Sequence, residues 1–197
     1  YVQLGKNKNP VIVKDRILKD DFTIDFADEL NLHKRANLKI QDGCSFMCSF
    51  CIIPFARGRA RSRQLENLLS EARSLVESGA KEIILTGVNI GTYDYDGKTV
   101  VEVVDELNKI DGLERIRISS IEPTTISTKL FEFMNDPAHA LVPYLHIPLQ
   151  AGTDKILKEM HRKYSVQEFV DFIQIANESV KDLCIGTDIM VGYPGET

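Results

Sequence analysis

The stretch LKIQDGCSFMCSFC at residues 38–51 joins a strand-like segment to three closely spaced cysteines. Cys44, Cys48 and Cys51 form a C-x3-C-x2-C run. Three thiolates are one fewer than a closed tetrahedral metal site requires. An iron–sulfur cube held by three cysteines keeps one iron without a protein ligand, and that iron is free to bind a small molecule. The spacing therefore predicts a 4Fe–4S cluster with an open coordination position.

Other interpretations of these cysteines stay open at this point. A structural zinc site would need a fourth ligand close by, and the remaining cysteine, Cys184, lies far downstream. Ordinary buried thiols are a further alternative. A disulfide framework is typical of short secreted chains, and the N-terminus YVQLGKNKNP has no signal-peptide pattern. With few cysteines in a cluster-like spacing, we expect a cytoplasmic protein.

Composition limits the class of protein. A chain of 197 residues with 43% hydrophobic and 27% charged residues permits one domain, or slightly more, with a sizeable core. The net charge of −5 argues against binding nucleic acid with the whole surface, so local basic patches must make any such contact. No apolar run approaches the length of a membrane span, and we expect no membrane partner.

The chain divides into two parts. Residues 1–35 are polar and charged, and we interpret them as a linker or an edge segment in which VIVKD and FTIDF are candidate short strands. From residue 36 to 197, strand-like segments alternate with amphipathic stretches of helical spacing, which is typical of an α/β fold with a parallel sheet. The predicted strands are 38–42, 82–88, 115–121, 144–150 and 184–191, and the chain stops after the fifth.

Three stretches between these strands carry helix signals. Apolar residues recur at spacings of three and four from Leu65 to Val76, and Gly79 is placed to end that helix. Thr99 with Glu102, and Ser165 with Glu168, have the spacing of capping boxes. We therefore expect helices over each of these stretches.

One face of four predicted strands is polar. In YLHIPLQ, for example, Leu145 and Ile147 fall on one face while His146 and Gln150 fall on the other. Strands that are buried on both faces normally form continuous apolar runs. The pattern predicts a curved parallel sheet with outer helices and a polar concave side, a partial (βα) barrel. Such folds place their sites at the carboxyl ends of the strands.

Five segments together resemble the radical S-adenosylmethionine (SAM) methylthiotransferase family. They are QDGCSFMCSFCIIPFARGRARSR, LTGVNIGTY, RISSIEP, LHIPLQAGTDKILKEMHRKY and DIMVGYPGET, and they extend from about Leu38 to Thr197. The resemblance implies a barrel of the radical SAM type, with a 4Fe–4S cluster on the three cysteines. It also implies S-adenosyl-L-methionine at the open iron and an electron donor such as flavodoxin or ferredoxin.

The resemblance also implies which residues contact SAM, and we assign no catalytic side chain. We expect the turn after the second strand to pair its backbone groups with the methionine moiety, and the loop after the fifth strand to lie on the adenine side. Polar groups after the third and fourth strands are candidates for hydrogen bonds, and an arginine further on is a candidate for a bidentate contact with the SAM carboxylate. The predicted cofactor residues are Thr86, Gly87, Val88, Asn89, Ser119, Ser120, Glu122, Gln150, Arg162, Asp188 and Gly192.

A run of arginines follows the cysteines. ARGRARSR contains Arg57, Arg59, Arg61 and Arg63, separated by small residues that would leave the guanidinium groups accessible to phosphates. In an acidic chain this predicts an RNA-facing rim beside the reaction centre. A solvated first turn of the following helix is the alternative, and Arg57 is also a candidate SAM contact.

The implied activity is insertion of a methylthio group at a C–H of a modified adenosine beside the tRNA anticodon, with SAM as radical source and as methyl donor. The subgroup acting on N6-threonylcarbamoyladenosine is most similar, followed by the isopentenyladenosine and ribosomal-protein subgroups. Residues 1–35 contain none of the cysteines of the family's auxiliary cluster domain, and a sixth strand and the RNA-binding β-domain are also missing. We therefore expect a fragment that holds one cluster and SAM but does not insert sulfur. A radical SAM enzyme of another reaction class and a zinc-bound RNA-binding module are the competing hypotheses.

Overall fold

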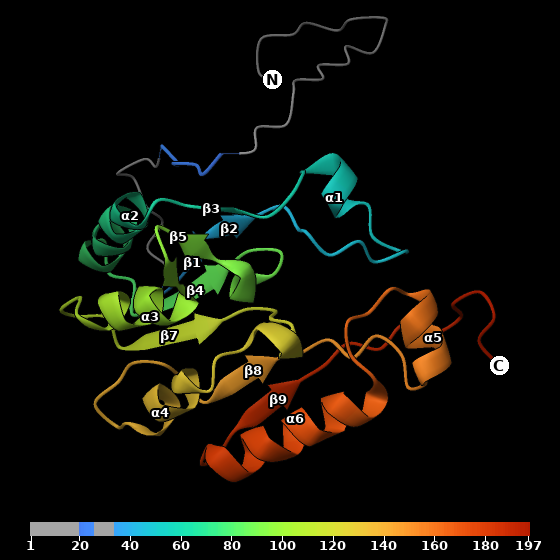
Figure 1. Cartoon of the computed structure of the whole chain (residues 1–197). Helices are drawn as coiled ribbons and strands as arrows, with labels where there is room; N and C mark the ends of the chain where they lie inside the picture. Colours follow the sequence, from blue (N-terminus) through green and yellow to red (C-terminus); the bar gives the residue numbers. More distant parts are fainter. Residues whose placement is uncertain (1–19, 26–33) are drawn as a thin grey trace, which may run out of the picture.

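A computed structural model describes residues 20–25 and 34–197 of the chain. Its main sheet is parallel and contains β1 (Arg35–Lys39), β4 (Glu82–Thr86) and β7 (Arg115–Ile118) in that order. A second parallel pair consists of β8 (Tyr144–His146) and β9 (Cys184–Gly186). A parallel bridge between Ser120 and His146 joins the end of β7 to β8. The five strands therefore follow one another in sequence order, as in part of a (βα) barrel (Figure 1).

All five predicted strands are present, but most end earlier than the sequence pattern indicated. The predicted strand 82–88 ends at Thr86, because the next amides bond to a glutamine side chain instead of a neighbouring strand. The first strand is shifted toward the N-terminus and begins at Arg35, which pairs with Glu82. The fifth strand ends at Gly186, although Gln150 and Ile189 form a further isolated bridge. Polar residues at the predicted strand ends thus belong to loops.

The helix signals are confirmed. The longer helices are α2 (Leu65–Glu77), α3 (Val100–Asn108) and α6 (Val166–Ser179). Both predicted capping boxes form, at Thr99 with Glu102 and at Ser165 with Glu168. Shorter helices and hairpin strands complete the described residues: α1 (Ile53–Ala56), α4 (Lys129–Asn135), α5 (Asp154–Glu159), η1 (Ile90–Thr92), η2 (Pro123–Thr125), β2 (Gln41–Asp42), β3 (Arg61–Ser62), β5 (Asp94–Tyr95) and β6 (Lys98–Thr99).

The core lies between the sheet and its outer helices. Side chains on one face of the strands have no exposed surface, namely Ile83, Leu85, Ile116, Ile118 and Leu145. The opposite face carries polar groups, as the alternation predicted. Helices α2, α3, α4 and α6 cover the apolar side (Figure 1). Within the described ranges the sheet does not close into a barrel, so the architecture is a curved, partial one.

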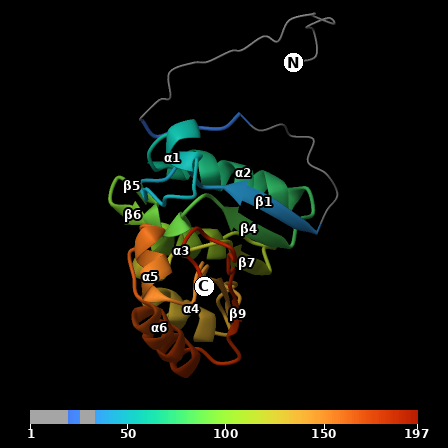
Figure 2. The same cartoon turned by 90° about the vertical axis from the view of Figure 1, so that its right-hand side faces the viewer.

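The carboxyl ends of the strands face one side of the molecule. In Figure 1 the arrows of β7 and β8 point toward α1 and α5, and Figure 2 shows this side from the front. At the edge near β3, residues 20–25 contribute a short segment in which Phe22 bonds to Ser62 and Gln64. The candidate strand at VIVKD lies outside the described residues. No helix in the described part of the chain has the length and apolar character needed to cross a membrane.

Candidate functional site

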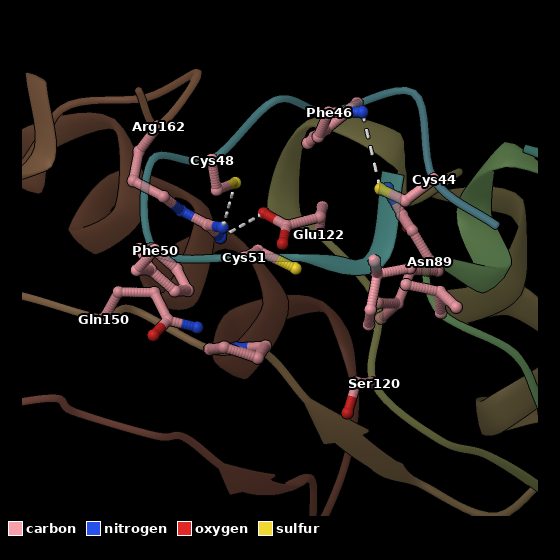
Figure 3. A pocket seen from close by; sticks show the side chains of 14 residues that line it. Cys44, Phe46, Cys48, Phe50, Cys51, Asn89, Ser120, Glu122, Gln150 and Arg162 are labelled. Carbon is pink, nitrogen blue, oxygen red and sulfur yellow. Dashed lines mark hydrogen bonds and ion pairs between the residues drawn. The ribbon is translucent and has the colours of Figure 1, made fainter. Parts of the chain in front are cut away.

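The three clustered cysteines line one cavity at the carboxyl ends of the strands (Figure 3). Cys44 and Cys48 are buried and Cys51 is half-buried, and all three are free thiols. The cavity is lined by Cys44, Phe46, Cys48, Phe50, Cys51, Ile53, Val88, Asn89, Ser120, Ile121, Glu122, Pro148, Gln150 and Arg162. Among its apolar members Val88 was predicted, whereas Phe46, Phe50, Ile53, Ile121 and Pro148 were not, although Phe46 and Phe50 lie inside the cysteine run.

A glycine fixes the start of the cysteine loop. Gly43 has φ +69°, and a Cβ atom there would lie 2.1 Å from the backbone oxygen of Arg59. The next amide, of Cys44, donates to the Gly58 carbonyl at 3.1 Å. Only a residue without a side chain allows this approach. The loop is therefore held against the segment that contains the arginine run.

The other end of the cysteine loop is bonded to the segment around the end of α5. The Ser49 amide donates to the Met160 carbonyl at 3.2 Å, and the Ser49 hydroxyl donates to the Glu159 carbonyl at 2.9 Å. The imidazole Nδ1 of His161 lies 3.1 Å from the Met47 carbonyl oxygen. The loop thus spans the carboxyl end of the sheet and is fixed on both sides, which orients its thiols toward the cavity.

The thiol arrangement fits an iron–sulfur cube better than a single metal ion. Within residues 20–25 and 34–197, no three His, Cys, Asp or Glu side chains are placed to hold one metal ion. A zinc site needs such convergence, whereas the cysteines of a cube bind separate irons. Cys184 is exposed and lies at the amino end of β9, away from the cavity. Burial raises the pKa of the Cys44 thiol, so binding of a metal would displace its proton.

Gln41 is a site residue that the sequence analysis missed. Its side chain is fully buried, and its Oε1 accepts from the amides of Val88 at 2.8 Å and Asn89 at 3.2 Å. Its Nε2 donates to the Gly43 carbonyl at 2.7 Å. One side chain therefore connects the cysteine loop to the turn after β4. A polar residue on the concave face was the available signal, but its partners depend on the neighbouring strand.

This arrangement changes the expectation for the turn at Thr86 to Asn89. The amides of Val88 and Asn89 are engaged by Gln41, so they could reach SAM only if Gln41 moved. The backbone of Gly87 lies close to the Gln41 side chain, because a Cβ at position 87 would lie 2.9 Å from Gln41 Oε1. Val88 and Asn89 line the cavity, whereas Thr86 and Gly87 do not. Asn89 is 3% exposed, and its Nδ2 has no hydrogen-bond partner within the described part of the chain.

The third and fourth strand ends bring further predicted residues to the cavity. Ser120 and Glu122 line it, but Ser119 does not. The Ser120 hydroxyl lies 2.7 Å from His146 Nδ1, and His146 Nε2 lies 3.3 Å from Asp188 Oδ2. Asp188 thus contacts His146 on the concave face and does not line the cavity.

Gln150 lines the cavity, and its backbone has φ +75°. It also forms the isolated β-bridge with Ile189. Gly192 lies in the loop after β9, where its amide donates to Glu196 at 2.6 Å. Arg162 also lines the cavity, but its guanidinium bonds to Glu122 and Cys48 (Figure 3), and to Tyr164. At most one N–H of Arg162 remains free, so the expected bidentate contact with a SAM carboxylate would require loss of a partner.

The arginine run does not form a uniform exposed rim. Arg57 and Arg59 are exposed, whereas Arg61 is largely covered and bonds to Asp42 at 3.2 Å. Arg63 is fully buried, so the expectation that its guanidinium would be accessible is wrong. It donates to Asn67 at 2.7 Å, in the first turn of α2, and pairs with Glu71, in the second turn. The docking of α2 supplies these acceptors, which the local spacing did not reveal.

Comparison with known proteins identifies relatives over most of the chain. The chain is 41% identical over 189 residues to the threonylcarbamoyladenosine tRNA methylthiotransferase MtaB of Bacillus subtilis. It is 40% identical over 166 residues to the tRNA-2-methylthio-N(6)-dimethylallyladenosine synthase of Acetivibrio thermocellus. These alignments cover 94% and 83% of this chain but 41% and 34% of the relatives, so the chain spans less than half their length.

Solved structures share the fold at low identity. The radical SAM methyltransferase TsrM from Kitasatospora setae, solved with cobalamin and a [4Fe-4S] cluster, has a TM-score of 0.65 and 18% identity; the match covers 82% of this chain and 32% of that one. Methylornithine synthase has a TM-score of 0.56 and 18% identity over 81% of this chain and 46% of its own. The model of the radical SAM superfamily matches residues 38–197. The chain therefore belongs to the radical SAM superfamily, whose members use a 4Fe–4S cluster and SAM.

Proposed function

We propose that this chain is the radical SAM core of a tRNA methylthiotransferase. The observation that carries the proposal is the 41% identity over 94% of the chain to an enzyme named for threonylcarbamoyladenosine in tRNA. The proposed reaction replaces a C–H of a modified adenosine beside the anticodon by a methylthio group. The threonylcarbamoyladenosine subgroup is the preferred substrate class, and the dimethylallyladenosine enzymes are nearly as similar.

Cys44, Cys48 and Cys51 are the proposed ligands of the 4Fe–4S cluster. The support is that all three thiols line one cavity and that Cys184 does not line it. When bound, the cluster and SAM supply one-electron radical chemistry. The protein contributes a position for SAM, apolar side chains of Phe46, Phe50 and Ile53 beside the thiols, and polar groups that orient the ligand.

The SAM contacts that we propose divide into two groups. Val88, Asn89, Ser120, Glu122 and Gln150 line the cavity. The free Nδ2 of Asn89 is a buried donor without a partner among the described residues, and a ligand oxygen would satisfy it. The second group does not line the cavity, and we assign its members to supporting or adenine-side roles: Thr86, Gly87, Ser119, Asp188 and Gly192.

Exposed arginines beside the cysteine loop are the proposed RNA contacts. Arg57 and Arg59 are exposed and follow α1 directly. Nη1 of Arg57 also lies 3.5 Å from Oδ1 of Asp42. That carboxylate forms ion pairs with Lys39 and Arg61 as well. Because the chain is acidic overall, a local contact of this kind suits a phosphate next to the cavity better than binding over the whole surface. Arg63 is not part of this proposal.

Sulfur insertion needs more than residues 1–197 in this proposal. The relatives are more than twice as long as the segment that they share with this chain. We assign the sulfur-donating auxiliary cluster and the second RNA-binding domain to that additional length. A small electron carrier such as flavodoxin or ferredoxin is the proposed reductant, and the cytoplasm is the proposed location.

The test begins with anaerobic reconstitution by iron and sulfide. We expect about four irons per chain, a brown protein, and formation of 5′-deoxyadenosine from SAM after reduction. A colourless protein that binds one zinc per chain would overturn the proposal and support the RNA-binding module. Formation of methylthiolated tRNA by this chain alone would overturn only the assignment of sulfur insertion to other domains.

The reaction class is tested with a protein that contains the additional length. We expect tRNA nucleosides from a strain lacking this activity to gain the mass of a methylthio group, first of all at N6-threonylcarbamoyladenosine. A ribosomal protein that gains this mass instead, with unmodified tRNA, would assign the chain to another subgroup.

A further inference from the structure

Arg162 is a buried charge beside the cysteine loop. Its side chain is 3% exposed, and it lies in the segment between α5 and α6. Burial opposes the charged form, but Glu122 and Tyr164 outweigh it and raise the pKa of the guanidinium above its usual value. Arg162 therefore carries its positive charge at every pH at which the protein is folded, a few ångströms from a proposed cluster ligand.

The guanidinium reaches three groups at once. Nη2 donates to Glu122 Oε2 at 2.5 Å, and Nη1 donates to Cys48 Sγ at 3.3 Å (Figure 3). Nη2 also donates to the Tyr164 hydroxyl at 2.8 Å. Nε donates to the same hydroxyl at 3.2 Å. Because an arginine has a planar fork of five donors, it can serve these directions together, whereas a lysine cannot.

Tyr164 fixes the arginine to the sheet. Its hydroxyl lies 2.6 Å from the carbonyl oxygen of Pro148, to which it donates its proton, and it accepts from Arg162. Pro148 follows β8 and lines the same cavity. The chain of contacts therefore runs from the Cys48 sulfur through Arg162 and Tyr164 to the end of β8, and it has little freedom to move.

We propose that Arg162 is a positioning residue that orients Cys48 and Glu122 and sets the reduction potential of the cluster. Hydrogen bonds to ligand sulfurs and nearby positive charge stabilise the reduced, more negative state of an iron–sulfur centre. The negative charge of Glu122 offsets the positive charge of Arg162, so the reduction potential of the cluster depends on both residues. This inference rests on the proposed ligand role of Cys48 and adds a function that the cysteine spacing alone does not assign.

The test is a redox titration of the anaerobically reconstituted protein, followed by the spectrum of the reduced cluster. We expect Arg162→Met to lower the ratio of reduced to oxidised cluster at a fixed potential about tenfold, a shift of about 59 mV for one electron. We expect Glu122→Gln to shift the ratio in the opposite direction, because the charge of Arg162 is then unbalanced. Wild-type potentials in both variants, at full iron content, would overturn the proposal.

Tyr164→Phe keeps the proposal testable if Arg162→Met does not retain iron. This variant leaves the charges unchanged and removes the hydroxyl that holds the guanidinium, so we expect a smaller fall in the same ratio. An unchanged ratio in Tyr164→Phe together with Glu122→Gln would contradict the proposal.

Arg117→Met is the matched control. Arg117 also pairs with a buried carboxylate, Glu82, at 2.8 Å, but it lies within β7 opposite Ile84 and does not line the cavity. We expect the reduction potential of this variant to equal that of the wild type. An equal shift would mean that loss of any arginine paired with a buried carboxylate changes the potential. Absence of a cluster from the wild-type protein would instead contradict the proposed function, so the two failures are distinguishable.

Discussion

The two ends of the parallel sheet are built differently. At the amino end, Glu82 is 3% exposed in its side chain and accepts from Arg35, Arg115 and Arg117. At the carboxyl end, a cavity is lined by three free thiols and by Asn89, whose Nδ2 has no hydrogen-bond partner among residues 20–25 and 34–197. Charges at the amino end satisfy one another, whereas groups at the carboxyl end are held in place but left available to a ligand. The first end serves stability and the second serves chemistry, as in barrel folds generally.

The same substitution at the two ends gives the largest contrast. We expect Cys48→Ala to lose most of the iron and sulfide after reconstitution, because one of three cluster ligands is gone. Cys184→Ala, at the amino end of β9, should keep the wild-type content. Iron analysis and absorbance of the two variants measure this. Equal iron loss would mean that Cys184 is a fourth ligand and that the two ends are not separate.

Gln41 tests whether the carboxyl end is rigid without its ligand. Gln41→Ala removes the acceptor of two amides and the donor to Gly43, and each unpaired buried group costs about 1–3 kcal/mol. We expect a lower melting temperature and weaker iron retention. A variant Gln41→Ala with wild-type iron retention would show that the cysteine loop keeps its shape without this contact.

Glu82 tests the amino end. We expect Glu82→Gln to lower the free energy of unfolding by about 2 kcal/mol, because a buried carboxylate that accepts from charged donors is replaced by a neutral amide. The iron bound per folded chain should not change. Glu114→Gln, at an exposed pair with Lys81, is the control and should stay within about 0.5 kcal/mol of the wild type. Loss of the cluster in Glu82→Gln would contradict the division between the ends.

The same carboxylate gives a pH dependence. Burial would raise the pKa of Glu82, but hydrogen bonds from Arg117 and Arg115 outweigh burial and lower it. A lowered pKa contributes stability above the unfolded value of about 4.3, and this contribution is lost as the pH falls through the folded pKa. Urea unfolding between pH 6 and pH 3, a range of about three units, should therefore show a steeper loss in the wild type than in Glu82→Gln. Parallel curves would contradict this assignment.

The smallest expected effect concerns the exposed arginines. We expect Arg57→Ala with Arg59→Ala to weaken tRNA binding a few-fold and to reduce its salt dependence, because phosphate contacts are lost. Arg35→Ala with Arg115→Ala removes the same two charges at the amino end of the sheet and should leave tRNA affinity unchanged. Filter binding at two salt concentrations measures both. Equal weakening would mean that the arginines act through net charge and not through position.

The local features of this chain were predictable and the long-range ones were not. Both capping boxes and the polar strand faces follow from residues a few positions apart, and the cysteine spacing indicated the site. The burial of Arg63 depends on β1, whose Lys39 carbonyl accepts from its guanidinium, and the role of Gln41 depends on the turn after β4. Strand ends were placed too late because polar residues with strand spacing continue into the loops. The contacts of Arg63 and Gln41 that the sequence did not reveal join segments far apart in the chain.

The most direct test of the account is the electron paramagnetic resonance spectrum of the reduced, reconstituted protein with and without SAM. Three cysteine ligands leave one iron open, so the account predicts that SAM changes the spectrum of the cluster. Cys184→Ala should respond in the same way as the wild type. A spectrum that SAM leaves unchanged, in protein with full iron and sulfide content, would contradict the claim that the carboxyl end of the sheet holds an open cluster.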